Sequence, residues 1–135
     1  MTEYAEISDD SAIWGPIIEK MFAKRYGNYE HIIGGLPSNA LQTLTGAPFD
    51  EYIHANLESK EIVWQVLSTA DKMKDFITAG TESAASDQFL NEVNLAKNHA
   101  YSVLGVKTLS NGTRLIKVRN PWGSERYSGP WSDKS

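Results

Sequence analysis

Apolar residues recur with helical spacing in two long segments of the chain. From Ser11 onward they fall three or four positions apart, which predicts an amphipathic helix that tolerates Pro16 in its first turn and ends at Gly27. A second stripe predicts a helix over about residues 59–74. Its apolar face is formed by Ile62, Val63, Val66, Leu67, Ala70 and Met73.

Shorter helical pieces are expected between these two helices. One covers about residues 29–33 and is closed by a pair of glycines. Ser38 has the character of an N-cap for another short helix, which ends at Gly46. Residues 1–11 are polar and acidic, and we expect them to form a flexible lead-in.

The remainder of the chain is dominated by β-forming residues. Residues 76–81 have the composition of a short strand, and a small polar loop over 81–87 follows. Residues 99–109 and 113–118 are richer still in β-formers, and Asn111-Gly112 between them indicates a hairpin with a two-residue type I′ turn. Helices followed by antiparallel strands predict an α+β fold class.

Composition narrows the class of protein without indicating an activity. The chain has 135 residues, 41% apolar and 22% charged, with a net charge of −4, which is typical of one soluble globular domain. No basic cluster suggests nucleic-acid binding, and no apolar run reaches the roughly 20 residues that span a bilayer. Without a charged-then-apolar leader, we expect a cytoplasmic protein with no transmembrane segment. The lack of cysteine excludes a thiol nucleophile from this chain.

The candidate chemistry lies at the outer end of the predicted hairpin. A two-residue turn pairs Asn120 with Val103, which shares a face with His99 but leaves the two polar residues roughly 13 Å apart along the strand. Direct contact then requires a bulge, strong coiling, or a loop at Pro121 that folds the amide back. An imidazole can hold a thiol as its thiolate, and an amide oxygen can orient that imidazole, while Trp122 could shield their hydrogen bond.

Each histidine also has a simpler interpretation. His99 taken alone fits a strand-end histidine, and Asn120 fits a turn residue before proline. His31 and His54 lie in helical or loop segments without a ligand pattern, so we expect them to be surface or partly packed residues and predict no metal-ligating residues in this chain.

Several motifs give the pair further meaning. The segments KNHAYSV (97–103), VRNPWG (118–123) and SGPWSD (128–133) follow one another in order, and WGPIIEK (14–20) precedes them. Together with the Leu44-Thr45-Gly46 stretch, they strongly resemble calpain-type cysteine peptidases. The resemblance covers about residues 12–135.

This resemblance implies a fold, an activity and partners. The chain would be the second, β-richer subdomain of a papain-like peptidase core, and the whole enzyme would hydrolyse peptide bonds in protein substrates inside the cell. His99 matches the family's catalytic histidine, Asn120 its orienting asparagine, and Trp122 the tryptophan near the substrate cleft. The missing subdomain would supply the cysteine, so this chain alone is expected to be inactive.

Two positions depart from the family pattern. Asn98 stands where the family usually has glycine, directly before the histidine, and tolerates an unusual backbone angle less freely than glycine does. The resemblance also implies calcium binding in the full-length protein, near Asp133. Arg126 occupies a position where relatives carry an acid, and a cation there opposes calcium binding by this chain.

Two other classes of protein remain open at this point. A non-catalytic calpain-fold scaffold would bind partners through the same fold, although it would have no reason to keep both His99 and Asn120. An unrelated α+β binding domain would need all the motifs to recur in order by chance. A cysteine after a glutamine in the sequence upstream would favour the peptidase over the scaffold.

Overall fold

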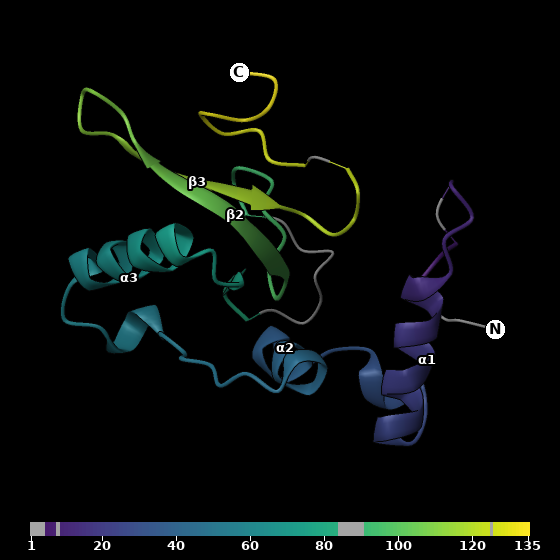
Figure 1. The fold of residues 1–135 in the computed structure, drawn as a ribbon. Coiled ribbons are helices and arrows are strands. Elements are labelled where there is room, and N and C mark those ends of the chain that lie inside the picture. Colours follow the sequence, from purple (N-terminus) through teal and green to yellow (C-terminus); the bar gives the residue numbers. More distant parts are fainter. Residues whose placement is uncertain (1–4, 8, 84–90, 125) are drawn as a thin grey trace. The chain divides into compact units, whose positions relative to one another are not determined.

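The computed structural model describes residues 5–7, 9–83, 91–124 and 126–135. The chain divides into two compact units, Met1–Ala47 and Pro48–Ser135 (Figure 1). The predicted lead-in over residues 1–11 and the predicted loop over 81–87 lie partly outside the described residues.

The first unit is helical. Its elements are α1 (Trp14–Tyr26), η1 (Glu30–Ile32) and α2 (Pro37–Thr45). They confirm the helices predicted from the apolar spacing. Gly27 follows α1 with a φ of 105°, and Gly46 follows α2 with a φ of 71°. These backbone angles suit glycine, which explains why both helices end where the sequence indicated.

One detail of α2 differs from the sequence prediction. The helix begins at Pro37, and its N-cap residue is Leu36, which makes no side-chain capping hydrogen bond. The prediction that Ser38 is the N-cap was therefore wrong. Proline has a fixed φ close to the helical value and no amide hydrogen to satisfy, so Pro37 takes the first helical position and moves Ser38 inside the helix.

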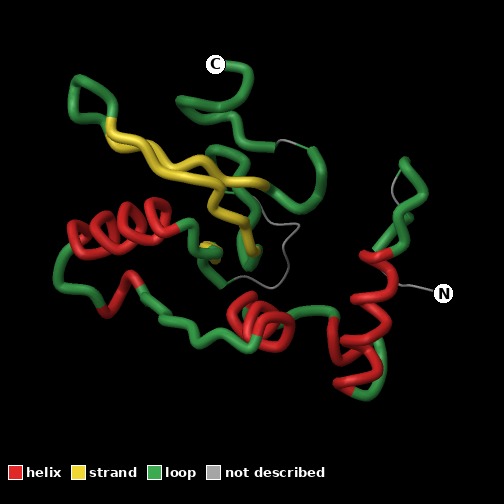
Figure 2. Tube along the Cα trace, in the orientation of Figure 1, coloured by secondary structure: helices red, strands yellow, loops and turns green. Residues whose placement is uncertain are grey.

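The second unit places a helix beside a three-stranded antiparallel sheet. The strand order is β1-β2-β3, and Figure 2 shows α3 running beside the sheet. The elements are η2 (His54–Asn56), α3 (Lys60–Met73), β1 (Ile77–Gly80), β2 (Ala100–Thr108) and β3 (Arg114–Arg119). The predicted α+β class, with helices followed by antiparallel strands, is confirmed.

Both ends of α3 match the boundaries that its sequence predicts. The Ser59 hydroxyl accepts a hydrogen bond from the Glu61 amide at 3.1 Å, which satisfies one of the amides at the helix start. Lys74 ends the helix in the left-handed region, with a φ of 63°. Near the start of β3, Arg114 donates two hydrogen bonds to the Glu61 carboxylate and lies 5.1 Å from the Trp64 ring, which ties helix and sheet together.

The hairpin between β2 and β3 has a longer loop than predicted. Thr108 pairs with Arg114, and the Leu109 amide donates to the Thr113 carbonyl at 2.8 Å, so three residues form the loop. Gly112 has a φ of 84°, whereas Asn111 is not among the residues with positive φ. A type I′ turn needs positive φ at both central residues, so the prediction of that turn was wrong. The glycine instead fits the last position of a three-residue loop.

A second irregularity lies further along the hairpin. The register shifts between Val103 and Gly105, where β2 contains a bulge. The Val106 amide next to this bulge lies 3.4 Å from the Asp71 carboxylate of α3. The predicted pairing of Asn120 with Val103 was therefore wrong, because Val103 pairs with Val118. Both shifts move Asn120 toward His99.

The tightly buried part of the second unit is small. Among its described residues, Ala96 and Tyr101 are the buried apolar side chains, with exposed fractions of 0% and 7%. Several large apolar side chains are exposed on this unit, including Phe76 and Trp131. Because few apolar side chains are buried, the polar contacts around Tyr101 contribute a larger share of the stability of this end of the sheet.

Candidate active site

The imidazole of His99 and the amide of Asn120 meet at the outer end of the hairpin. The His99 Nε2 atom lies 2.9 Å from the Asn120 Oδ1 atom, and both side chains are half-buried. His99 directly precedes β2, and Asn120 directly follows β3. The structure thus brings together the two residues that the sequence placed on one face.

The observed register explains how this contact forms. Ser102 pairs with Arg119, and continuing that register by one residue puts Asn120 opposite Tyr101. Two positions then separate the amide from His99, instead of the four that a two-residue turn would leave. A turn closes the remaining gap, since the Gly123 amide donates to the Asn120 carbonyl at 3.3 Å.

A second hydrogen bond fixes which way the Asn120 amide points. The backbone amide of Trp122 donates to Asn120 Oδ1 at 3.1 Å. A backbone amide can only donate, so the atom that it faces must be the oxygen of the side chain. The same oxygen faces His99, and the ring nitrogen Nε2 must therefore be the donor. In the neutral ring the other nitrogen, Nδ1, carries no proton, so Nδ1 is the nitrogen that can accept a proton from another group.

Two aromatic rings surround the imidazole. The centroid of the Trp122 ring lies 4.5 Å from that of His99, at an angle of 46° between the planes. The Tyr101 ring meets His99 edge to face, with centroids 5.0 Å apart. Tyr101 is buried, whereas Trp122 is 38% exposed. The imidazole therefore lies between a buried tyrosine ring and a more accessible tryptophan ring. The Trp122 ring thus lies beside the imidazole, and its shielding of the hydrogen bond stays a prediction.

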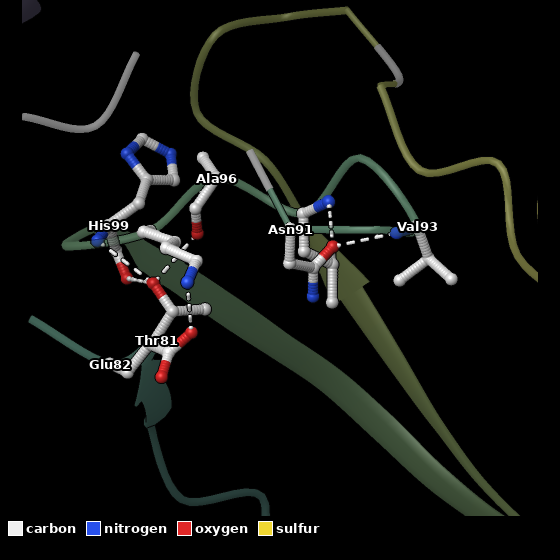
Figure 3. Close-up of polar contacts among 8 residues, drawn as sticks. Thr81, Glu82, Asn91, Val93, Ala96 and His99 are labelled. Carbon is white, nitrogen blue, oxygen red and sulfur yellow. Dashed lines mark hydrogen bonds and ion pairs between the residues drawn. The ribbon is translucent and has the colours of Figure 1, made fainter. Parts of the chain in front are cut away.

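The backbone of His99 is held by Thr81, a residue that sequence reasoning missed. The Thr81 hydroxyl accepts a hydrogen bond from the His99 amide at 3.0 Å and lies 2.8 Å from the Ala96 carbonyl (Figure 3). Directly before the histidine, Asn98 has a φ of 50°, so the left-handed angle implied by the family's glycine is present at this position. No sequence signal marks Thr81, because its contact crosses between two strands.

The loop that leads to Ala96 has its own polar supports. Asn91 Oδ1 accepts hydrogen bonds from the amides of Val93 and Leu95, at 3.0 and 2.9 Å (Figure 3). The Asn94 side chain donates to the Ser128 hydroxyl at 2.8 Å. These contacts hold the described part of the loop before the histidine and join it to the C-terminal segment.

The other two histidines lie away from this pair in the sequence and in their contacts. His31 follows α1, is exposed, and its Nδ1 lies 2.7 Å from the Tyr26 carbonyl. His54 is exposed at the start of η2. Both match the expectation of surface or partly packed residues.

Possible metal-ligating side chains are spread out over the described residues. Among them, no group of three or more histidine, aspartate or glutamate side chains lies close enough to hold a metal ion. Asp133 is among the described residues and belongs to no such group.

The geometry defines a class of site. A small sheet holds an imidazole whose Nε2 proton is bound by an oriented amide, and its Nδ1 atom can accept a proton from a thiol or a similar group. The chain belongs to the calpain family of cysteine proteases, because the family model "Calpain family cysteine protease" matches residues 2–135.

Individual relatives agree with this family. The chain is 34% identical over 139 residues to the "Calpain-type cysteine protease DEK1" of Zea mays, and 35% identical over 133 residues to "Calpain-9" of Homo sapiens. It is also 32% identical over 137 residues to "Calpain clp-1" of Caenorhabditis elegans. These matches cover 98%, 95% and 98% of this chain, but only 6%, 19% and 17% of the relatives. The chain therefore spans less than a fifth of the length of these relatives.

No helix among the described residues is long and apolar enough to cross a bilayer.

Proposed function

We propose that residues 12–135 form the histidine- and asparagine-bearing subdomain of an intracellular calpain-like cysteine endopeptidase with a papain-like core. The observation that carries this proposal is the 2.9 Å contact between His99 Nε2 and Asn120 Oδ1, with the amide direction fixed by Trp122. Membership of the calpain family supports the reaction class, and protein substrates follow from that class.

The proposed reaction begins with the missing subdomain, which supplies a cysteine. His99 takes the thiol proton at Nδ1, and the thiolate attacks the carbonyl carbon of the peptide bond. The imidazolium then gives this proton to the leaving amine as the C–N bond breaks. A water molecule, deprotonated by the same ring, hydrolyses the acyl-enzyme and regenerates the thiol.

Asn120 has a separate role in this scheme. Its oxygen holds the Nε2 proton, which keeps Nδ1 as the basic nitrogen and prevents the ring from turning. A neutral amide does this without adding a negative charge beside the imidazolium. Trp122 contributes its backbone amide, which orients Asn120, and its ring, which covers one side of the imidazole.

The test joins this chain to the cysteine-bearing half of a calpain catalytic core and follows cleavage of a fluorogenic peptide. The chain alone should not cleave the peptide, because it contains no cysteine. In the joined protein, His99→Ala should lower kcat by about 10²–10⁴-fold, the usual range for loss of a general acid–base residue. His31→Ala is the matched control, since that imidazole is exposed in the first unit, and it should leave kcat unchanged.

Two outcomes would contradict the proposal. Full activity of the His99→Ala protein would show that this imidazole does not act in the reaction. A well-folded joined protein that binds the peptide but never cleaves it would favour the non-catalytic scaffold instead.

A further inference from the structure

We propose that Thr81 is a positioning residue for His99, whose hydroxyl fixes the backbone from which the imidazole projects. This inference rests on the proposed function, because it assigns to Thr81 a role in keeping the ring aligned for proton transfer. The threonine lies directly after β1, and the histidine lies directly before β2.

The regular hydrogen bonding between β1 and β2 ends at Thr81 and His99. Gly80 pairs with Ala100 as the last regular step of the β1–β2 ladder. One residue further, the Thr81 amide still donates to the His99 carbonyl, at 3.0 Å. The return bond, however, runs from the His99 amide to the Thr81 hydroxyl, at 3.0 Å. A side-chain oxygen thus occupies the place that a strand carbonyl takes in a regular ladder.

The backbone turn at Asn98 explains why a side-chain oxygen, and not a backbone carbonyl, accepts the hydrogen bond from the His99 amide. Asn98 has a φ of 50°, outside the extended range of a strand, and its amide donates to the Glu82 carbonyl at 2.7 Å. The backbone therefore turns immediately before His99, where a regular ladder cannot continue. The hydroxyl completes the pairing at the residue that carries the imidazole.

The same hydroxyl also reaches a buried part of the loop. It lies 2.8 Å from the Ala96 carbonyl and 3.2 Å from the His99 carbonyl, and its hydrogen can be donated to either. Ala96 is completely buried, and its amide donates to the Tyr101 hydroxyl at 3.1 Å. Thr81 therefore connects His99 to the buried residues in the described part of this unit, while the imidazole extends away from Thr81 (Figure 3).

The consequence for catalysis follows from the small tolerance of such sites. Productive geometry has to be held to within about 0.5 Å, and supporting hydrogen bonds provide this precision. Without the hydroxyl, the His99 amide and the Ala96 carbonyl both lose a partner of the correct polarity. The segment between them can then shift, and the ring shifts with it relative to Asn120.

The experiment compares Thr81→Val, which removes the hydroxyl at nearly constant volume, with Thr81→Ser, which keeps it. In the joined core, Thr81→Val should lower kcat between about 10- and 100-fold with a smaller change in KM, because misplacement of a catalytic group acts on the chemical step. Thr81→Ser should recover most of this activity. Thr69→Val is the control, since the Thr69 hydroxyl binds the Gln65 carbonyl on the exposed surface of α3.

A second readout needs no activity. In the 135-residue chain labelled with ¹⁵N, the ring nitrogens of His99 report which of them carries the proton. Wild type and Thr81→Ser should show the Nε2-protonated ring, whereas Thr81→Val should show a mixture of the two tautomers.

The outcomes separate this inference from the proposed function. If Thr81→Val matches wild type in kcat and in the ring spectrum while His99→Ala is inactive, the positioning role is wrong and the proposed function stands. If His99→Ala is active, the proposed function fails, and the ring spectrum still decides whether Thr81 orients His99. Should Thr81→Val fail to fold, Thr81→Ser decides alone: activity close to wild type is expected, and a large loss overturns the inference.

Discussion

Removal of one buried hydroxyl should weaken the part of the fold that supports His99. Tyr101→Phe keeps the ring that meets the imidazole edge to face and deletes only the phenolic oxygen. That oxygen lies 3.1 Å from the Ala96 amide, which donates to it. Because Ala96 has an exposed fraction of 0%, water does not reach its amide easily after the change. The substitution therefore leaves a buried donor unsatisfied.

The expected magnitude follows from the burial of both groups. An unsatisfied buried donor costs about 1–3 kcal/mol, and the removal of a polar atom from an apolar environment offsets part of that cost. We expect a net loss of about 1–2 kcal/mol for Tyr101→Phe. In a domain of about 60–100 residues, the size class of the second unit, each kcal/mol lowers the melting temperature by about 4–8 °C.

The assay combines urea unfolding with hydrogen exchange of individual amides. Urea unfolding followed by tryptophan fluorescence gives the change in free energy, and the Ala96 amide should lose protection in the variant. Tyr127→Phe is the matched control, because the Tyr127 hydroxyl donates to the Pro130 carbonyl at 2.9 Å in an exposed setting. Its effect should stay within about 0.5 kcal/mol. Equal losses in the two variants, or unchanged exchange at Ala96, would refute the reasoning.

Three further changes test other parts of the second unit. Gly112→Ala should lower the free energy of unfolding by about 1 kcal/mol because of its φ of 84°, whereas Gly80→Ala, which meets nothing within 4 Å, should not. By the same reasoning, Asn98→Ala should cost about 1 kcal/mol and Asn98→Gly less than about 0.5 kcal/mol in urea unfolding, since φ is 50°. Hydrogen bonds from Arg114, more than its charge, hold the pKa of Glu61 below its ordinary value of 4.5, so the stability that they give is present above that value and is lost as the pH falls through the lowered pKa. Glu61→Gln should therefore make the melting temperature depend less on pH in this acid range. A pH dependence identical to that of wild type would contradict the role of the ion pair.

Periodic segments were the part of the fold that sequence could predict well. α1 and α3 appear where apolar residues recur at helical spacing, and Gly27 and Ser59 mark ends that local chemistry decides. The prediction that failed in the first unit was also local. Ser38 favours the N-cap position and Pro37 favours the first helical position, and both cannot be satisfied at the start of α2. Preferences of single residues do not decide between these two starts.

The hairpin loop shows a different limit. Asn111-Gly112 fits a two-residue type I′ turn, but a glycine with positive φ also fits the last position of a three-residue loop. Both loops place β-forming residues on either side, so the sequence pattern is the same for both. The choice depends on pairing along the whole hairpin and on the bulge near Gly105, which lies against Asp71 of α3. Such packing is not visible in the order of residues.

Thr81 illustrates why supporting residues escape a sequence reading. Its hydroxyl contacts the backbone of His99, 18 residues away, through the pairing of β1 with β2. The sequence predicted both strands but contained no information on their register. Hydroxyl-to-backbone contacts also place little demand on the type of the second residue, so no motif records them.

The register of the hairpin also explains how a wrong predicted pairing still put Asn120 on the same face of the hairpin as His99. Side chains alternate between the faces of a strand, so a shift of one residue would turn Asn120 away from His99. The structure contains two such shifts, one at the three-residue loop and one at the bulge next to Gly105. Together they return Asn120 to the predicted face and bring it two positions closer to the imidazole. The 2.9 Å contact therefore depends on the loop and the bulge together, and losing either one alone would turn the amide to the opposite face.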